Sequence, residues 1–357
     1  MRIIILGAGR VGESVAETLV SEANDITVVD PDPERLRMLE DRLDLRGVTG
    51  NGIQPSVLRG AGAQDCDLFI ACTPQDETNL VACKIAHDVF GIPTTIARLR
   101  SPEFRQGDKL LEKDGFAVDH VICPEESVTR TIHQLIEYPE ALQVVKFSQS
   151  QAHLIVVRVS AGSYLANHSI AEFRAHRADV PMRIVGIYRR DQELPVAAET
   201  RVQAGDEVFV LTGRETVRAA LHTIGNPDRP VRRVMIAGGG KVGLRLARGL
   251  VGKCEVKILE NNRKRCDYLA SELPPEMLVL QGDGTDEELL LDENVADMDL
   301  FIAVTNDDED NILSAMLAKR MGARRVIALI NRRAYADLMQ GSTIDIAISP
   351  AHAVIGE

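Results

Sequence analysis

The chain has 357 residues, and its 45% hydrophobic and 26% charged residues give the balance of a globular protein large enough for two or three domains. Its net charge of −12 argues against nucleic acid as a partner and against direct docking on an anionic lipid surface. No run of 18 apolar residues is present, so we expect no segment to insert into the membrane.

The first 140 residues or so alternate short apolar runs with amphipathic stretches. The intervening stretches have helical spacing, as at 11–21, 33–42 and 76–90. Strands and helices in alternation predict an α/β fold with a doubly wound parallel sheet of the Rossmann type. The runs that predict strands are 2–6, 25–29, 45–49, 67–72, 94–98 and 118–122.

The middle of the chain has a different pattern. We expect strands at 142–147 and 153–160, and again in the runs MRIVGIYRR and DEVFVLTG. Helices are expected near Ser169–His176 and over Arg214–Ile224. These elements predict a small α+β lobe. The segment Asn226–Pro230, NPDRP, indicates a linker after it.

The strongest signal is an internal duplication. Residues 3–12, IIILGAGRVG, match residues 234–243, VMIAGGGKVG. Further motifs follow at nearly the same spacing, so that LFIACTPQDETN at 68–79 matches LFIAVTNDDEDN at 300–311. The sequence therefore predicts two Rossmann-type domains on either side of the α+β lobe. The expected domains are 1–138, 139–226 and 227–357.

Each copy opens with a Gly-x-Gly-x-x-Gly turn between a predicted strand and a predicted helix, the context in which this motif indicates a dinucleotide site. The first glycine permits the tight turn, the second lets the backbone approach a pyrophosphate, and the third lets helix and strand pack closely. The helix N-terminus attracts phosphates, and a basic residue in the turn adds a cation. A tight turn that binds nothing is the alternative. The residues are Gly7, Gly9, Arg10, Val11 and Gly12, and Gly238, Gly240, Lys241, Val242 and Gly243.

An acid closes the second strand of each copy, Asp30 in the first and Glu260 in the second. A carboxylate at this place accepts hydrogen bonds from the adenosine ribose hydroxyls. It also repels a 2′-phosphate, which disfavours NADP, but it does not distinguish NAD from ATP, ADP or AMP. A solvated acid at a strand end is the alternative interpretation.

A tight Gly-x-Gly follows the third strand of each copy, with Asn51 and Gly52 in the first and Asp283 and Gly284 in the second. The polar side chain is expected near the adenine edge, where it can accept a hydrogen bond from the adenine amino group. The alternative is turn chemistry alone, since Asn-Gly and Asp-Gly are favoured turn dipeptides.

Polar residues follow the fourth strand, at the carboxyl edge where open α/β sheets bind ligands. The acids among them are alternatively stabilising residues of the first helical turn. Arg98 ends the fifth strand, where it is placed to reach a phosphate, whereas Leu329 has this position in the second copy. We therefore expect the two sites to differ in ligand or affinity. The polar residues are Thr73, Asp76 and Asn79, and Thr305, Asp308 and Asn311.

Residues for catalysis are not apparent. The eight histidines do not cluster, and neither HExxH nor GxSxG occurs. The six cysteines lack zinc-site spacing, so we expect reduced thiols and no metal site. A dehydrogenase needs a proton donor beside the nicotinamide, and none is evident. The sequence therefore favours a binding protein over an enzyme.

Several of these motifs together resemble the RCK, or KTN, domain family. They are the strand-GAGRVG start, Asp30, the GNG turn, CTPQDETN, and ARLRSPEF at 97–104. The duplicated order resembles the TrkA branch, in which two Rossmann N-lobes alternate with two small C-lobes, and TRVQAGDEVFVL at 200–211 resembles the C-lobe. The sequence ends at Glu357, where that branch has a second C-lobe, so we expect this lobe to be missing from the sequence.

The resemblance implies N-lobes that bind NAD(H) or, alternatively, ATP, ADP or AMP. It implies pairing through a helix at Glu125–Tyr138, with assembly into dimers and a tetrameric ring under a TrkH-type potassium channel subunit in the membrane. The expected function is a cytoplasmic regulatory subunit, peripheral to the inner membrane, that gates potassium uptake. Two alternatives stay open: an NAD-dependent oxidoreductase, and a scaffold whose second Rossmann copy is purely structural.

Overall fold

The computed structural model forms two compact units that divide between Ser127 and Val128. Apart from Pro230, the linker expected at Asn226–Pro230 lies outside the described residues. Within the described part of the chain, no helix is long and apolar enough to cross a membrane. The structure describes all residues except 21, 23, 102, 105–107, 148–150, 191, 226–229, 333–334, 336–338, 340–342 and 351–357.

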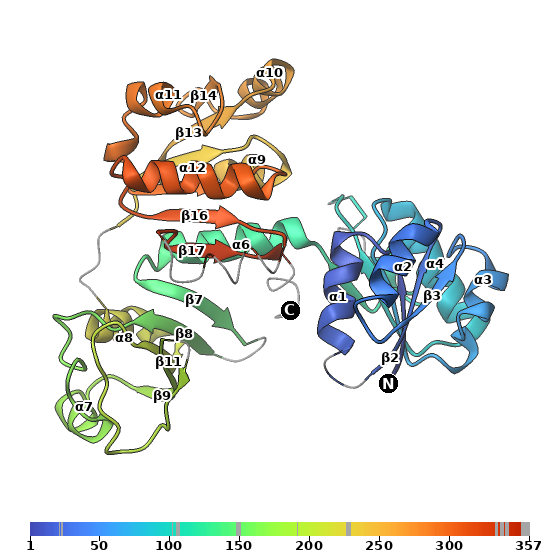
Figure 1. Cartoon of the computed structure of the whole chain (residues 1–357), viewed down its shortest axis with the longest axis horizontal. Coiled ribbons are helices and arrows are strands. Elements are labelled where there is room, and N and C mark those ends of the chain that lie inside the picture. The colour runs from blue at the N-terminus through green and yellow to red at the C-terminus, as the bar shows by residue number, and fades with distance from the viewer. Residues whose placement is uncertain are drawn as a thin grey trace. The chain divides into compact units, whose positions relative to one another are not determined.

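The first unit, coloured from blue to cyan in Figure 1, is built on a six-stranded parallel sheet. The strand order is β3-β2-β1-β4-β5-β6. This order is that of a doubly wound Rossmann sheet, so the predicted fold class is confirmed. The strands are β1 (Arg2–Leu6), β2 (Asp25–Asp30), β3 (Arg46–Thr49), β4 (Leu68–Ala71), β5 (Thr94–Arg98) and β6 (His120–Ile122). The helices are α1 (Arg10–Val20), α2 (Pro33–Glu40), α3 (Pro55–Gly60), α4 (Asp76–Phe90) and α5 (Asp108–Leu111), and α6 (Pro124–Glu137) follows β6.

Strand β1 shows why the sheet is buried on both faces. Its side chains alternate, so that Ile3 and Ile5 pack with α1 and α2 on one face. Ile4 and Leu6 pack with α3 and α4 on the other face. All four are almost fully buried, which explains the continuous apolar run in the sequence.

The middle lobe is a five-stranded antiparallel sheet with the order β10-β9-β11-β8-β7. The helix predicted near Ser169 is present and begins with a capping box, in which the Ser169 and Glu172 side chains each bind the other residue's backbone N–H. The strands are β7 (Ala141–Lys146), β8 (Ala152–Arg158), β9 (Met182–Arg189), β10 (Gln192–Glu193) and β11 (Glu207–Gly213), and the helices are α7 (Ile170–His176) and α8 (Val217–Ile224).

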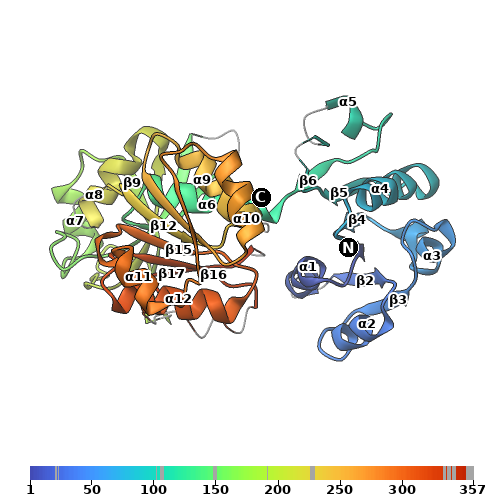
Figure 2. The same cartoon turned by 90° about the horizontal axis from the view of Figure 1, so that it is seen from above.

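The last part of the chain repeats the first fold. Its strand order, β14-β13-β12-β15-β16-β17, is that of the first sheet. Figure 2 shows α9 and α10 on one face of this sheet and α11 and α12 on the other. The strands are β12 (Arg233–Ala237), β13 (Glu255–Glu260), β14 (Leu278–Gln281), β15 (Leu300–Ala303), β16 (Val326–Leu329) and β17 (Ile346–Ile348). The helices are α9 (Lys241–Leu250), α10 (Arg263–Glu272), α11 (Glu287–Asp292) and α12 (Asp308–Arg320).

Most predicted elements match within two residues, and the helix predicted at 76–90 matches α4 at both ends. Two α-helices of the first lobe were not predicted. Helices α3 and α5 have six and four residues, too few for a helical period to appear in the sequence. The helix expected over Arg214–Ile224 begins as a 3₁₀ turn, and α8 starts at Val217.

The aspartate of the TRVQAGDEVFVL segment, Asp206, is buried and forms an ion pair in the middle lobe. Asp206 is 2% exposed and accepts two hydrogen bonds from Arg189, both at 2.8 Å. The Gln203 N–H donates a third at 2.7 Å. Burial opposes the charge, but these donors prevail and lower the pKa of Asp206 below its ordinary value. The pair fixes the turn before β11 to the end of β9.

We expect Asp206→Asn to destabilise the middle lobe by about 2 kcal/mol, because it weakens a charge-assisted network at a buried site. Because the folded pKa is lowered, the stabilisation is present above the ordinary pKa near 3.8 and is lost as pH falls through the folded value. Urea unfolding between pH 7 and pH 3 measures both effects. Glu207→Gln, which removes the exposed pair with Arg158, is the control and should cost under about 0.5 kcal/mol. Equal losses of stability in Asp206→Asn and Glu207→Gln would contradict the role given to the ion pair of the buried Asp206.

Candidate functional site

The glycine turn of each Rossmann lobe has the geometry that its three glycines predict. Gly7 and Gly238 have φ angles of 105° and 110°, a region that favours glycine. A Cβ on Gly12 would lie 1.9 Å from the Gly7 carbonyl oxygen, and one on Gly243 would lie 1.9 Å from that of Gly238. The first helix of each lobe therefore packs against its turn at a distance that only glycine permits.

The second glycine of each turn has open space around it. A Cβ on Gly9 or on Gly240 would meet no atom within 4 Å. Arg10 and Lys241, which follow them, are exposed at the helix starts. A phosphate therefore has access to the backbone and to a cation at the helix N-terminus. Val11 and Val242, the next residues, are half-buried and buried and hold the helix against the sheet.

The acid of the first lobe is fixed beside this turn. Asp30 is 5% exposed, and its Oδ2 accepts a hydrogen bond from the Ala8 N–H at 2.7 Å. Its Oδ1 accepts one from the Asp32 N–H at 2.9 Å. A carboxylate has about four lone-pair positions, so each oxygen can accept a further bond from a ribose hydroxyl.

The second lobe repeats the arrangement and adds an arginine. Glu260 accepts hydrogen bonds from the Gly239 N–H at 3.0 Å and the Asn262 N–H at 2.8 Å. Arg265 donates from Nε to the Gly239 carbonyl at 2.7 Å, and its guanidinium lies 4.7 Å from the centre of the Tyr268 ring. Arg265 was not predicted from the sequence. In the first lobe Arg35 has this position and pairs with Asp32 instead.

The residues after the third strands serve first as turn residues. The Asn51 Oδ1 accepts from the Ile53 N–H at 3.2 Å, and the Asp283 Oδ1 accepts from the Thr285 N–H and hydroxyl at 2.8 Å. Both side chains are exposed. Their glycine neighbours pack over the ends of the first strands: a Cβ on Gly52 would lie 2.2 Å from Leu6 Cδ1, and one on Gly284 would lie 2.8 Å from Ala237 Cβ.

The asparagines after the fourth strands are buried and hydrogen-bond the ends of neighbouring strands; each is called the asparagine brace below. Asn79 is fully buried; its Oδ1 accepts from the Thr73 N–H at 2.9 Å, and its Nδ2 donates to the Arg98 carbonyl at 2.8 Å. Asn311 makes the same bonds to the Thr305 N–H at 2.8 Å and the Leu329 carbonyl at 2.9 Å. Each asparagine therefore ties the ends of two strands together and holds the threonine at the sheet edge.

The acids that begin the next helices hold the loop after the fifth strand. The Asp76 Oδ2 accepts from the N–H groups of Arg100 at 2.9 Å and Ser101 at 2.8 Å. Asp308 likewise accepts from the N–H groups of Asn331 and Arg332, both at 2.9 Å. These bonds shape the carboxyl edge of each sheet from within the protein.

At this edge the first lobe has Arg98, where the second lobe has Leu329. Arg98 is 9% exposed, and its Nη2 donates to Glu125, on α6, at 3.2 Å. Among the described residues, Arg98 Nε and Asp76 Oδ1 are buried polar atoms without a hydrogen-bond partner. Such atoms are costly unless a ligand or water satisfies them, so the edge fits a polar ligand. The part played by Glu125 was not predicted, because nothing in the sequence pairs it with Arg98.

In the second lobe, Leu329 is buried in place of Arg98. The nearby Arg332 is engaged: its Nη1 pairs with Glu309 at 2.8 Å, and its guanidinium lies 5.0 Å from the centre of the Tyr335 ring. The two candidate sites therefore share the glycine turn and the acid but differ beyond them.

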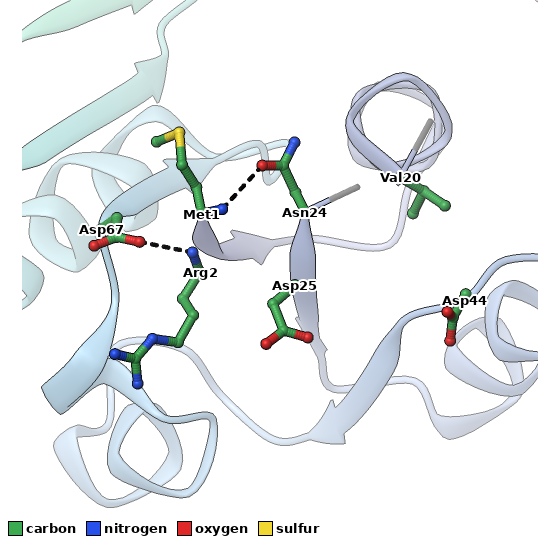
Figure 3. Close-up of a pocket in the computed structure, with 7 residues that line it drawn as sticks. All are labelled: Met1, Arg2, Val20, Asn24, Asp25, Asp44 and Asp67. Atoms are coloured by element: carbon green, nitrogen blue, oxygen red, sulfur yellow. Dashed lines mark hydrogen bonds between the residues drawn. The ribbon is translucent and has the colours of Figure 1, made fainter. Parts of the chain in front are cut away.

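A hollow of about 480 Å³ lies at the opposite, amino end of the first sheet (Figure 3). Asp25 begins β2 there, and Asp67 accepts a hydrogen bond from the Arg2 N–H at 2.7 Å. The Met1 ammonium donates to Asn24 at 3.2 Å. These residues are at the other ends of the strands from the glycine turn, so the hollow is separate from the candidate site.

The cysteines of the first lobe are unsuited to reaction chemistry. Burial raises the pKa of Cys72 to about 12, so its thiol stays protonated at neutral pH. Cys66, Cys83 and Cys123 are also buried, and among the described residues none of the three is in a disulfide. In the described ranges, no group of three or more histidine, cysteine or acidic side chains is arranged to hold a metal ion.

Fold and site together define a protein with two Rossmann lobes, each with a glycine turn and a neighbouring acid, separated by a small α+β lobe. The family model of the TrkA-N domain matches residues 3–124 and 234–350, and that of the TrkA-C domain matches residues 154–225. Because the first model covers both Rossmann lobes, the duplication is also a duplication of one family domain.

The chain is 46% identical to the Trk system potassium uptake protein TrkA of Vibrio alginolyticus and 47% identical to that of Halomonas elongata, over 356 residues in each case. These matches cover 99% and 100% of this chain and 78% of each relative. The chain therefore belongs to the TrkA family of potassium uptake proteins. A solved GsuK channel bound to NAD has the same fold, with a TM-score of 0.72 at 19% identity over 99% of this chain and 62% of that chain.

The contrast between the glycines is testable. We expect Gly12→Ala and Gly243→Ala to destabilise their lobes by about 3 kcal/mol, because the added methyl group overlaps a backbone oxygen. Gly9→Ala and Gly240→Ala, at open positions, should cost under about 1 kcal/mol. Urea unfolding followed by circular dichroism measures the difference. Similar losses at the two kinds of position would show that the close approach is not the constraint.

Proposed function

We propose that this chain is a regulatory subunit that binds an adenine nucleotide in each Rossmann lobe and thereby controls a membrane potassium transporter. The observation that carries the proposal is the pairing of an open second glycine with a fixed carboxylate in both lobes. The glycine gives a pyrophosphate access to the backbone, and the carboxylate accepts from the ribose.

NAD(H) is the ligand we favour, with ATP, ADP or AMP as the alternative. The GsuK channel, which has the same fold, has been solved with NAD bound. Asp30 and Glu260 repel a phosphate on the ribose 2′ position, so NADP is disfavoured. The two lobes need not share one ligand, since Arg98 is present only in the first.

The proposed partner is a TrkH-type potassium channel subunit in the inner membrane, to which this chain attaches from the cytoplasm. Pairing through α6 and assembly into dimers and a tetrameric ring are part of the proposal. So are the domain limits 1–138, 139–226 and 227–357, which the three separate sheets support. Nucleotides then control transport only if they bind one shape of the assembly more tightly than another.

Regulation through several sites is physically reasonable. Shifting a conformational equilibrium from 1:99 to 99:1 requires about a 10⁴-fold preference of the ligand for one state. Two sites in each chain divide this requirement, so that each ligand needs only a modest preference. No catalytic group is part of the proposal.

Calorimetric titration with NAD, NADH, NADP, ATP, ADP and AMP tests the proposal. We expect adenine nucleotides to bind and NADP to bind at least about tenfold more weakly. Asp30→Ala and Glu260→Ala should each remove or weaken one site by about tenfold or more, because each removes hydrogen bonds to a charged acceptor. Absence of binding at millimolar nucleotide would overturn the proposal, and steady NADH consumption with a small metabolite would favour an oxidoreductase.

The role of Arg98 can be separated from that of the acid. Arg98→Gln should weaken ADP and NAD at the first site by about tenfold, since a charge-assisted contact with phosphate is lost. Adenosine, which has no phosphate, should bind as before. Leu329→Gln at the corresponding position of the second lobe is the matched control. It should change neither the affinity of the first site for ADP and NAD nor its affinity for adenosine. Equal weakening of adenosine and ADP would mean that Arg98 does not reach a phosphate.

A further inference from the structure

An arginine of the second Rossmann lobe holds the turn that leads into the middle sheet. Arg325, immediately before β16, donates from Nη1 to the Pro139 carbonyl and from Nη2 to the Ala141 carbonyl, the latter at 2.6 Å. Pro139 lies between the end of α6 and the start of β7, and Ala141 is the first residue of β7. Among the described residues, no carboxylate is within ion-pair distance of Arg325, so the two carbonyls are its main polar partners.

These carbonyls belong to a tight turn. The Ala141 N–H donates to the Tyr138 carbonyl at 3.0 Å, which closes a four-residue turn with Pro139 at its second position. The Pro139 and Ala141 carbonyls take no part in that closing bond, and the planar fork of a guanidinium spans both. The guanidinium therefore fixes the turn relative to the second sheet.

The environment shows that this contact is costly to make. Burial lowers the pKa of Arg325 to about 10, although Asp345 and Glu140 act in the opposite direction. The group still carries its charge at neutral pH, so a partly buried charge is held by two neutral acceptors. Such a group is held in place, because losing either carbonyl removes one of its two hydrogen-bond acceptors.

The duplication shows that the contact is specific to the second lobe. The N–H of Thr95 in β5 donates to Asp119, and that of Val326 in β16 donates to Asp345, both at 2.8 Å, so these residues correspond. The residue before Thr95 is Thr94, which has no guanidinium to offer. Arg325 is therefore an addition to the shared fold and not a part of it.

The other end of the same strand reaches the candidate nucleotide site. Strand β16 has four residues and ends at Leu329, whose carbonyl accepts from Asn311 at 2.9 Å. Asn311 in turn accepts from the Thr305 N–H and hydroxyl, both at 2.8 Å. A continuous set of hydrogen bonds and one short strand thus joins the carboxyl edge of the second sheet to the turn before β7.

We propose that Arg325 is a positioning residue through which nucleotide occupancy of the second Rossmann lobe acts on the turn before the middle sheet. This inference rests on the proposed nucleotide site. When a ligand shifts Thr305 and Asn311, β16 moves with them, and the arginine moves the turn at Pro139. Coupling of this kind has to be measured between the two ends, since proximity alone does not establish it.

Hydrogen exchange of the full chain, with and without NAD or ADP, measures this coupling. An Asp30→Ala background restricts the response to the second site. There we expect nucleotide to slow exchange in peptides covering 138–146 by about threefold or more. In Arg325→Met this slowing should disappear, while the calorimetric affinity for the same nucleotide stays within about twofold. Arg325→Lys, which keeps the charge but not the fork, should retain part of the effect.

Arg324→Met is the matched control, because Arg324 is the neighbouring residue but pairs with Asp299 at 2.9 Å within its own lobe. In Arg324→Met, nucleotide should still slow hydrogen exchange in 138–146. Two results overturn the inference while the proposed function stands. In the first, nucleotide slows exchange in 138–146 as much in Arg325→Met as in the parent chain. In the second, nucleotide binds to the parent chain without changing exchange in 138–146. If no nucleotide binds to the parent chain, both fall. Should Arg325→Met fail to fold, Arg325→Lys decides: an undiminished effect overturns the inference.

Discussion

In each Rossmann lobe, the first helix lies so close to the preceding turn that a methyl group on its third glycine would overlap a backbone oxygen. This approach, made at Gly12 and again at Gly243, directs the helix N-terminus toward the open space over the second glycine. The turn also presents the backbone N–H that fixes the acid at the end of the second strand. The candidate phosphate and ribose positions therefore both depend on one steric constraint.

The two lobes serve as a comparison within one molecule. The asparagine brace has the same bonds in both lobes, and in both the acid accepts from two N–H groups of the loop after the fifth strand, so these features belong to the shared fold. Differences appear where side chains reach beyond the sheet edge. The first lobe has Arg98, and the second has Arg265 and Arg325 at places where the first makes other contacts. We infer that duplication kept the framework while each copy acquired its own surroundings.

Local patterns predicted the framework well. Alternation of apolar runs and amphipathic stretches is a property of neighbouring residues, so both sheets and helix α4 could be located from the sequence. Glycine spacing located the turns for the same reason. The roles of Asn79 and Asp76 could not be predicted in this way, because each has a partner some twenty residues away that meets it only in the folded sheet.

Contacts between distant segments could not be predicted from the sequence at all. Glu125 and Arg98 are of opposite charge, but so are many other pairs in the chain, and only the fold selects this one. Arg325 is less predictable still, because its partners are backbone carbonyls that every residue offers. Their selection depends on how α6, the middle sheet and the second Rossmann sheet pack together.

If each Rossmann lobe holds an adenine nucleotide, the number of ligands bound per chain is the most direct test of that claim. Equilibrium dialysis of the purified protein against labelled NAD and labelled ADP gives that number. We predict two sites per chain with unequal affinities, because the glycine turn and the acid recur while their surroundings differ. A chain that takes up neither nucleotide at millimolar concentration would contradict the claim and leave both Rossmann lobes with a structural role alone.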